Sequence, residues 1–173
     1  MKVTDTHIYF YSTKEIYSNF YLTEFVDPAT KIKFNSSEQA FMWYKAKQFD
    51  DIESMKLLET ETDPAKAKLI GRSVKNYNDN VWVMERFQKM MYVCYLKFDQ
   101  NEYLKNAIID THDKILVEAS KSDCVWGVGL YQTDPLILDC KYWRGSNLLG
   151  NALMLVRKQL VDNRAVEISK III

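Results

Sequence analysis

The hydrophobic positions of this chain repeat at helical spacing over long stretches and alternate with polar ones only over short stretches. Between residues 78 and 98 the apolar positions fall on one face and predict the longest, central core helix: Val83, Phe87, Met90, Met91, Cys94 and Phe98. Further helices are predicted over 36–49, 51–59, 63–71, 101–109 and 148–160. Gly71 is the expected end of the 63–71 helix.

Short apolar stretches predict a few strands, at residues 7–11 and 115–119. The turn residues 27–30 predict a small hairpin whose second arm is 31–34. The tail, 166–173, is predicted as an added strand. No repeat, low-complexity tract or linker divides the chain. The pattern therefore predicts a single α-rich α+β domain over residues 1–173, with a helical core and a few short strands.

The predicted helix that starts near residue 36 carries two charged residues on its apolar stripe. Glu38 and Lys45 share this stripe with Phe41 and Met42. Seven residues are almost two turns, so both side chains point the same way, with Cα atoms about 10 Å apart along the axis. Buried charges are costly without partners, which suggests the wall of a polar pocket. From this segment alone, Glu38 as a cap and Lys45 reaching solvent is an equally open alternative.

The stretch Asp123-x-x-Trp126-Gly127-x-Gly129 could contact a ligand through its backbone. Two closely spaced glycines allow a ligand to approach the backbone, and the flanking residues supply a carboxylate and a stacking surface. Taken alone, the pattern favours a tight turn in which Asp123 caps backbone amides and Trp126 fills the core.

The run Trp143-Arg144-Gly145-Ser146-Asn147-Leu148-Leu149-Gly150 leads into the last predicted helix. Unpaired amides and the helix dipole at such a start suit an anion. The same run is also compatible with Asn147 as the N-cap and Gly150 as a point of contact between two helices.

The composition limits the possible functions more than it limits the possible folds. The chain has 47% hydrophobic and 27% charged residues, as in ordinary soluble globular proteins. Its 23 basic and 23 acidic side chains give zero net charge, which argues against a bulk electrostatic nucleic-acid binder but not against a pocket for one nucleotide. The 11 Tyr, 8 Phe and 4 Trp residues suit both core packing and base stacking.

The cysteine and histidine placement gives no sign of a disulfide framework or a metal site. Cys94, Cys124 and Cys140 are odd in number and widely spaced, and His7 and His112 belong to no ligand-spaced cluster. The N-terminus lacks a secretory signal pattern, and no apolar run is long enough to span a bilayer. The sequence therefore predicts a reduced cytoplasmic setting, with no metal and no membrane partner.

An ordered series of short stretches covers roughly residues 8–160. The series comprises Ser18-Asn19-Phe20; Ser37-Glu38-Gln39-Ala40-Phe41 with Lys45; Gly71-Arg72; Trp82 with Arg86 and Met90; Lys97-Phe98 with Asn101; Leu116-Val117-Glu118; Asp123-x-x-Trp126-Gly127-x-Gly129; Gly145-x-Asn147-x-Leu149-Gly150; and Leu153-Met154-x-x-Arg157. This ordered set resembles the NADAR family of YbiA-like proteins. Gln39 departs from a common His, and Trp43-Tyr44 from a smaller Gln-Ala pair, which bears on substrate fit.

The resemblance implies an enzyme that hydrolyses an N-glycosidic bond to ribose without a metal or other cofactor. Members of the family either remove ADP-ribose from guanine bases or hydrolyse phosphoribosyl-amino-pyrimidine intermediates of the riboflavin pathway. ADP-ribosylated guanine, in nucleotides or in DNA, is the first expectation, and the phosphoribosyl nucleotide is the alternative. Two further hypotheses are a non-catalytic module that binds ADP-ribose or NAD and a purely structural helical protein.

The residues suit this chemistry. Breaking the C1′–N bond builds positive charge on the ribose, which a carboxylate stabilises, while a second group protonates the leaving base. The resemblance assigns Glu38 and Asp123 to these roles in either order, and Lys45 is a candidate amine nucleophile on the opened sugar. The expected substrate-binding residues are Asn19, Phe20, Arg72, Trp82, Trp126, Gly127, Gly129 and Asn147. For Trp82, plain core packing remains slightly favoured.

Overall fold

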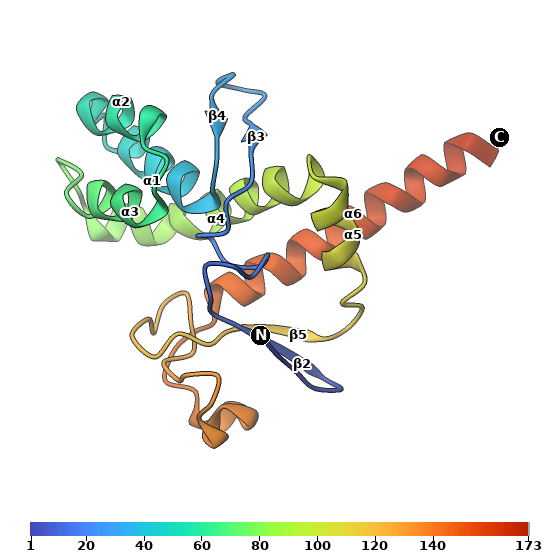
Figure 1. Ribbon diagram of the computed structural model, residues 1–173. Coiled ribbons are helices and arrows are strands. Elements are labelled where there is room, and N and C mark those ends of the chain that lie inside the picture. Colours follow the sequence, from blue (N-terminus) through green and yellow to red (C-terminus); the bar gives the residue numbers. More distant parts are fainter. Residues whose placement is uncertain (173) are drawn as a thin grey trace. The chain divides into compact units, whose positions relative to one another are not determined.

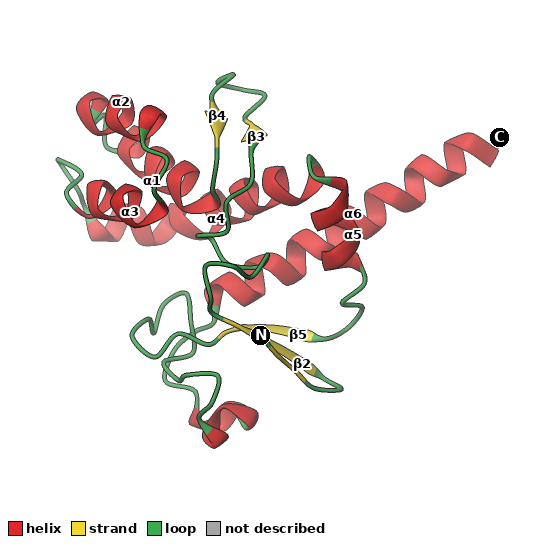
Figure 2. Cartoon of the chain, viewed as in Figure 1, coloured by secondary structure: helices red, strands yellow, loops and turns green. Residues whose placement is uncertain are grey.

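Helices dominate the chain, and the strands are short and few (Figure 2). The computed structural model describes residues 1–172, with side chains through Asn163. The α-rich α+β fold expected from the sequence is confirmed. The elements group into two compact units: the central unit, Asn19–Gln100, and the terminal unit, which combines Met1–Ser18 with the chain from Asn101 onward. The assignment of residues 1–173 to one domain stays a prediction.

The central unit is a cluster of helices preceded by a small hairpin. The antiparallel strands β3 (Phe25–Val26) and β4 (Lys33–Phe34) form the hairpin expected from its turn residues. The four helices are α1 (Ser37–Gln48), α2 (Ile52–Thr60), α3 (Pro64–Arg72) and α4 (Asp79–Asp99). Helix α1 contacts the other three (Figure 1).

Polar side chains determine where these helices begin. The side chains of Ser36, Asp51, Asp63 and Asn78 each accept a hydrogen bond from a backbone amide in the first turn that follows. Such caps satisfy amides that have no partner within the helix, which explains why the helix starts were predictable from sequence.

Gly71 does not end α3, contrary to the prediction, because the helix continues to Arg72 and Ser73 is its C-cap. A Cβ atom at Gly71 would lie 1.9 Å from Sδ of Met42 on α1. The glycine therefore permits close approach of two helices rather than a change of backbone direction.

The buried face of α4 agrees only in part with the predicted one. Met90, Cys94 and Phe98 are buried as expected, whereas Val83 is 43% exposed. Near the start of the helix, Trp82 is buried instead, with its ring centroid 5.1 Å from that of Phe41 on α1. The predicted stripe was therefore wrong in the first turns, where a single large ring fills the contact with α1.

The described part of the terminal unit contains a three-stranded sheet, two α-helices and two short 3-10 helices, Pro135–Leu138 and Cys140–Tyr142. Strands β1 (Lys2–Val3), β2 (His7–Phe10) and β5 (Ile115–Glu118) lie in that order, with β1 antiparallel and β5 parallel to β2. Parallel pairing requires a long connection, and the whole central unit together with α5 (Glu102–Ile109) lies between β2 and β5 in the sequence. Helix α6 (Leu148–Ile172) contacts β5 and α5.

The predicted C-terminal strand is wrong over residues 166–172, which continue helix α6, while Ile173 lies outside the described residues. The tail is rich in Val and Ile, and this composition suggested a strand. No Gly or Pro follows Gly150, so nothing in the sequence ends the helix once it has started. None of the helices in the described part of the chain has the length and hydropathy needed to cross a membrane.

A buried carboxylate stabilises the hairpin and the helices of the central unit. Asp27 is 0% exposed and accepts hydrogen bonds from the hydroxyls of Tyr44, Tyr92 (2.8 Å) and Thr30 (3.0 Å) and from the amide of Ala29 (2.9 Å). Burial alone would raise the pKa of Asp27. The hydrogen bonds outweigh it, so the pKa lies below its ordinary value.

Asp27→Asn is expected to lose stability in a pH-dependent way. Because the pKa of Asp27 is lower in the folded than in the unfolded chain, its contribution is complete above about pH 4 and is lost as the pH falls through the folded-state pKa. The variant should be less stable than wild type by about 2 kcal/mol at neutral pH, and by less in acid. Urea unfolding at several pH values measures this. The exposed Asp5→Asn is the control, and a pH-independent difference would contradict the argument.

Candidate active site

Glu38 lies buried in the first turn of α1. Its residue is 5% exposed, and its backbone amide donates to the carbonyl oxygen of Asn19 at 3.0 Å. The side-chain cap of the helix is Ser36, whose hydroxyl accepts from the amide of Gln39 at 3.2 Å. Glu38 is therefore not the cap, and it lies in the first turn, at the positive end of the helix dipole.

The departure at Gln39 has a structural explanation. Its Oε1 accepts from the amide of Asn35 at 2.8 Å, and its Nε2 donates to the carbonyl oxygen of Leu58 at 2.7 Å. Both ends of this buried side chain thus connect the start of α1 to its neighbours, one of them α2. Gln39 stabilises the backbone that carries Glu38.

Two buried polar atoms beside Glu38 have no hydrogen-bond partner among the described residues: Oδ1 of Asn19 and the hydroxyl of Ser37. Asn19 is 8% exposed, and its Nδ2 makes only a weak hydrogen bond, at 3.4 Å, to Sδ of Met90. Buried polar atoms are almost always paired in native proteins, so unpaired ones in two residues that adjoin Glu38 indicate a place for a polar ligand.

Lys45 is half-buried and held by several contacts. Its Nζ donates to the carbonyl oxygen of Gly71 at 2.8 Å and lies 4.2 Å from the ring centroid of Tyr77 and 5.8 Å from that of Trp82. Burial lowers the pKa of Lys45, and the charge of Asp79 acts in the opposite direction. A lysine with a lowered pKa presents more unprotonated amine near neutral pH than a surface lysine does.

The remaining predicted residues of the central unit differ in their exposure. Trp82 is 6% exposed, so most of its ring serves core packing, although one part lies near Lys45. Phe20 is half-buried, and Nζ of Lys68 lies 5.5 Å from its ring centroid. Arg72 is exposed at the end of α3. The structure therefore brings Glu38 next to Asn19, and Lys45 next to Trp82.

In the terminal unit, Asp123 forms the tight turn that its pattern favoured. Its Oδ1 accepts hydrogen bonds from the amides of Val125 (2.9 Å) and Trp126 (2.7 Å). This geometry uses one carboxylate oxygen of a half-buried side chain. Trp126 is itself half-buried, so it does not simply fill the core.

The glycines after Trp126 are required by the loop itself. A Cβ atom at Gly127 would lie 2.9 Å from the carbonyl oxygens of both Asp123 and Glu118. Gly129 has a φ of +70°, where other residues are strained. Close packing of the loop is sufficient to explain both glycines, and their contact with a substrate stays a prediction.

The start of α6 is not an open anion site. The amides of residues 146–149 donate to carbonyl oxygens of residues 124–127 at 2.9–3.2 Å. The expectation of unpaired amides at these positions was therefore wrong. The loop carbonyls already occupy the donors that an anion would need.

Asn147 connects the start of α6 to strand β5. Its Oδ1 accepts from the amide of Glu118 at 3.0 Å, and its Nδ2 donates to the carbonyl oxygen of Leu116 at 2.9 Å. Its φ of 50° is in the left-handed region, where asparagine is tolerated. Asn147 is thus not a side-chain N-cap, and a contact between Asn147 and substrate stays a prediction. Gly150 also faces this strand rather than a second helix.

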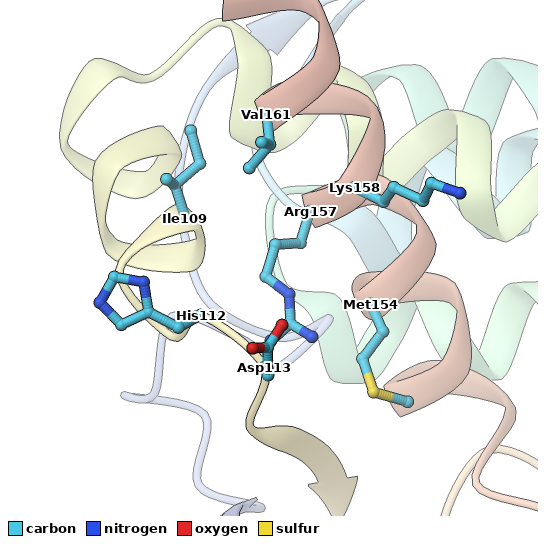
Figure 3. A pocket seen from close by; sticks show the side chains of 7 residues that line it. All are labelled: Ile109, His112, Asp113, Met154, Arg157, Lys158 and Val161. Carbon is cyan, nitrogen blue, oxygen red and sulfur yellow. The ribbon is translucent and has the colours of Figure 1, made fainter. Parts of the chain in front are cut away.

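A pocket of about 570 Å³ in the terminal unit contains none of the predicted site residues. It lies between α6 and the turn after α5, and Figure 3 shows the carboxylate of Asp113 directed toward the guanidinium of Arg157. Nη1 of Arg157 donates to the hydroxyl of Thr111 (2.7 Å) and the carbonyl oxygen of Lys114 (2.8 Å). The resemblance at Arg157 therefore marks a residue that joins α6 to this turn.

Sequence reasoning missed Tyr77 and Asp79, whose only signal was their place beside the N-cap of α4. Neither residue belongs to the ordered series of stretches in the sequence, and the contact of Tyr77 with Lys45 reveals them. Within the described residues, no group of three or more His, Cys, Asp or Glu side chains is arranged to hold a metal ion.

The fold is that of a known structure, the NMR structure of the Escherichia coli protein YbiA. The two structures agree with a TM-score of 0.75 and 26% sequence identity, over 95% of this chain and 90% of that one. Residues 9–161 match the NADAR domain, so the chain belongs to the NADAR family. The resemblance seen in the sequence is confirmed.

Two relatives extend this comparison. The chain is 35% identical over 171 residues to Protein irg-1 of Caenorhabditis elegans, which covers 91% of this chain and 81% of the relative. It is 31% identical over 165 residues to N-glycosidase R617 of Acanthamoeba polyphaga mimivirus, covering 90% and 97%.

Proposed function

We propose that this protein is an N-glycosidase that hydrolyses the bond between a ribose and a nucleobase, with ADP-ribosylated guanine in nucleic acid or nucleotides as its substrate. The observation that carries the proposal is the burial of Glu38 in contact with Asn19: the amide of Glu38 donates to the carbonyl oxygen of Asn19 at 3.0 Å, and the buried Oδ1 of Asn19 has no hydrogen-bond partner among the described residues. The mimivirus relative, named N-glycosidase R617, supports the reaction class.

Glu38 suits the positive charge that develops on the ribose. A carboxylate removed from water stabilises an oxocarbenium-like transition state more strongly than an exposed one. The carboxylate can also activate the attacking water. Oδ1 of Asn19 would accept a hydrogen bond from a ribose hydroxyl and so orient the sugar.

Asp123 is proposed as the second carboxylate. Hydrolysis of a glycosidic bond needs one group for the sugar cation or the water and another for the proton on the leaving base. The hydrogen bonds from the amides of Val125 and Trp126 fix the Asp123 side chain in one orientation. Which carboxylate has which role follows from the pH dependence of each single variant.

Lys45 offers a covalent route to the same products. Its amine would attack C1′ of the ring-opened sugar, which is still bonded to the base, and form an imine as the base leaves with a proton. Hydrolysis of that imine would then release the sugar and free the amine. Borohydride added during turnover would reduce that imine to a stable secondary amine. An ADP-ribosyl adduct on the peptide containing Lys45 would establish this route, and no adduct under turnover would exclude it.

Incubation with ADP-ribosylated guanine DNA tests the proposal, with release of ADP-ribose followed by mass spectrometry. Wild-type protein should release ADP-ribose, and Glu38→Gln, Lys45→Ala and Asp123→Asn should each reduce the rate. The exposed Glu53→Gln, Lys66→Ala and Asp5→Asn provide matched controls. Thermal unfolding of every variant separates loss of activity from loss of fold.

Two other outcomes have defined meanings. Hydrolysis of phosphoribosyl-amino-pyrimidines without activity on the DNA would assign the smaller substrate, which also suits a chain of zero net charge. Binding of ADP-ribose that is retained in Glu38→Gln, with no turnover of either substrate by wild type, would indicate a non-catalytic module.

A further inference from the structure

We propose that Tyr77 and Asp79 are positioning residues for Lys45: the ring of Tyr77 holds the lysine amine in place, and Asp79 orients that ring through its hydroxyl. The inference rests on the proposed function only where it says that Lys45 takes part in the reaction. The positioning itself depends on contacts within the central unit.

The contacts form a chain from the start of α4 to the amine. The hydroxyl of Tyr77 donates to Oδ1 of Asp79 at 2.6 Å. The ring of Tyr77 lies under Nζ of Lys45, 4.2 Å from its centroid, which is well inside the range of a cation–π contact. The carbonyl oxygen of Gly71 accepts from the same amine at 2.8 Å. Two parts of the central unit, the end of α3 and the start of α4, thus restrain one flexible side chain.

The position of Tyr77 is not explained by core packing alone. Its residue is 43% exposed, and its ring meets Phe49 edge-on at 5.4 Å while one face is directed at Lys45. A lysine side chain has large rotamer freedom, and a catalytic amine gains rate when that freedom is removed before the substrate binds.

Two effects on the pKa of Lys45 oppose each other. Burial lowers the pKa of Lys45, and the charge of Asp79 raises it. Burial, the hydrogen bond to Asp79 and the charge of Asp79 raise the pKa of Tyr77 to about 12, while Arg86 lowers it. Tyr77 therefore stays a neutral hydroxyl donor at neutral pH. The charged groups that affect the pKa values of Lys45 and Tyr77 are Asp79, which acts on both, and Arg86, which acts on Tyr77.

Competitive labelling with acetic anhydride measures the amine directly and needs no substrate. Peptide mass spectrometry gives the labelling of Lys45 across a pH series, whose midpoint reports the pKa of Lys45. Asp79→Asn should move this midpoint to lower pH, because the variant loses a charge that favours the ammonium. Lys141 is the matched internal control, since it pairs with Asp139 at 2.7 Å and lies 4.8 Å from the ring of Tyr142.

Kinetics then separate the ring from the hydroxyl. Tyr77→Leu, which removes the ring, should lower kcat about 10-fold with little change in KM. Tyr77→Phe keeps the ring and should recover most of that loss. Tyr142→Leu, which removes the ring of the control pair, should leave kcat unchanged.

Each result decides the inference. Labelling profiles of Lys45 that are the same in wild type, Asp79→Asn and Tyr77→Leu would overturn it, whatever the enzyme turns over. Altered labelling of Lys45 without turnover of any substrate would uphold the positioning and refute the proposed function instead. Should Tyr77→Leu fail to fold, Asp79→Asn, at an exposed position, still decides the question.

Discussion

Glu38→Gln is expected to lower kcat for N-glycosidic cleavage by about 1,000-fold while the protein stays folded. Glutamine has nearly the same shape as glutamate and can occupy the same buried place in the first turn of α1. It cannot carry the negative charge that stabilises the ribosyl cation or accept a proton from water. The loss should therefore appear in kcat rather than in substrate affinity.

Single-turnover kinetics and equilibrium binding of the same substrate separate these effects. The Kd of Glu38→Gln should stay within about 3-fold of wild type, since the hydrogen-bonding capacity of the side chain is largely kept. The exposed Glu53→Gln controls for the removal of an acidic group from the same unit. A variant with the wild-type rate would remove Glu38 from the catalytic residues and direct attention to Asp123.

The helix starts of this protein could be predicted because their causes are local. Ser36, Asp51, Asp63 and Asn78 cap helices within three residues of themselves, so their effect is visible in the sequence. The ends depend on distant contacts. Gly71 looked like a stop, yet its reason for being glycine is Met42, which belongs to another helix.

In the candidate site, too, local features could be predicted from the sequence and distant contacts could not. Glu38 and Lys45 share a helix face by simple periodicity, so their common direction could be inferred. The contacts that Glu38 and Lys45 make with other parts of the chain could not be inferred. The carbonyl oxygen of Asn19 meets Glu38 from 19 residues earlier, and Tyr77 reaches Lys45 from 32 residues later, in each case through tertiary structure.

The prediction of an anion site at the start of α6 was wrong because it, too, depended on contacts from a separate part of the chain. A helix start in a sequence shows which amides lack partners inside the helix, but not which carbonyl oxygens arrive from elsewhere. Here the loop 124–127 supplies them. The glycines of this loop are needed for that close packing, which a pattern cannot distinguish from close approach of a phosphate.

Gly150→Ala is expected to destabilise the terminal unit by about 3 kcal/mol, which shifts Tm by about 10 °C in a chain of this size. A Cβ atom at this position would lie 2.0 Å from the carbonyl oxygen of Leu116 and 2.5 Å from Nδ2 of Asn147. The first atom belongs to the backbone of β5, and the second donates to that same oxygen. The strand and the helix must therefore separate, and the asparagine loses its bonding geometry.

Gly71→Ala is the matched comparison, because both glycines lie in helices where alanine alone would favour folding by about 1 kcal/mol. At Gly71 the nearest atoms belong to the side chain of Met42, which is flexible and can move aside. Thermal unfolding should thus show a much larger loss for Gly150→Ala than for Gly71→Ala. Equal losses, or a gain at Gly150, would mean that β5 and α6 can separate without cost and that Asn147 does not hold them together.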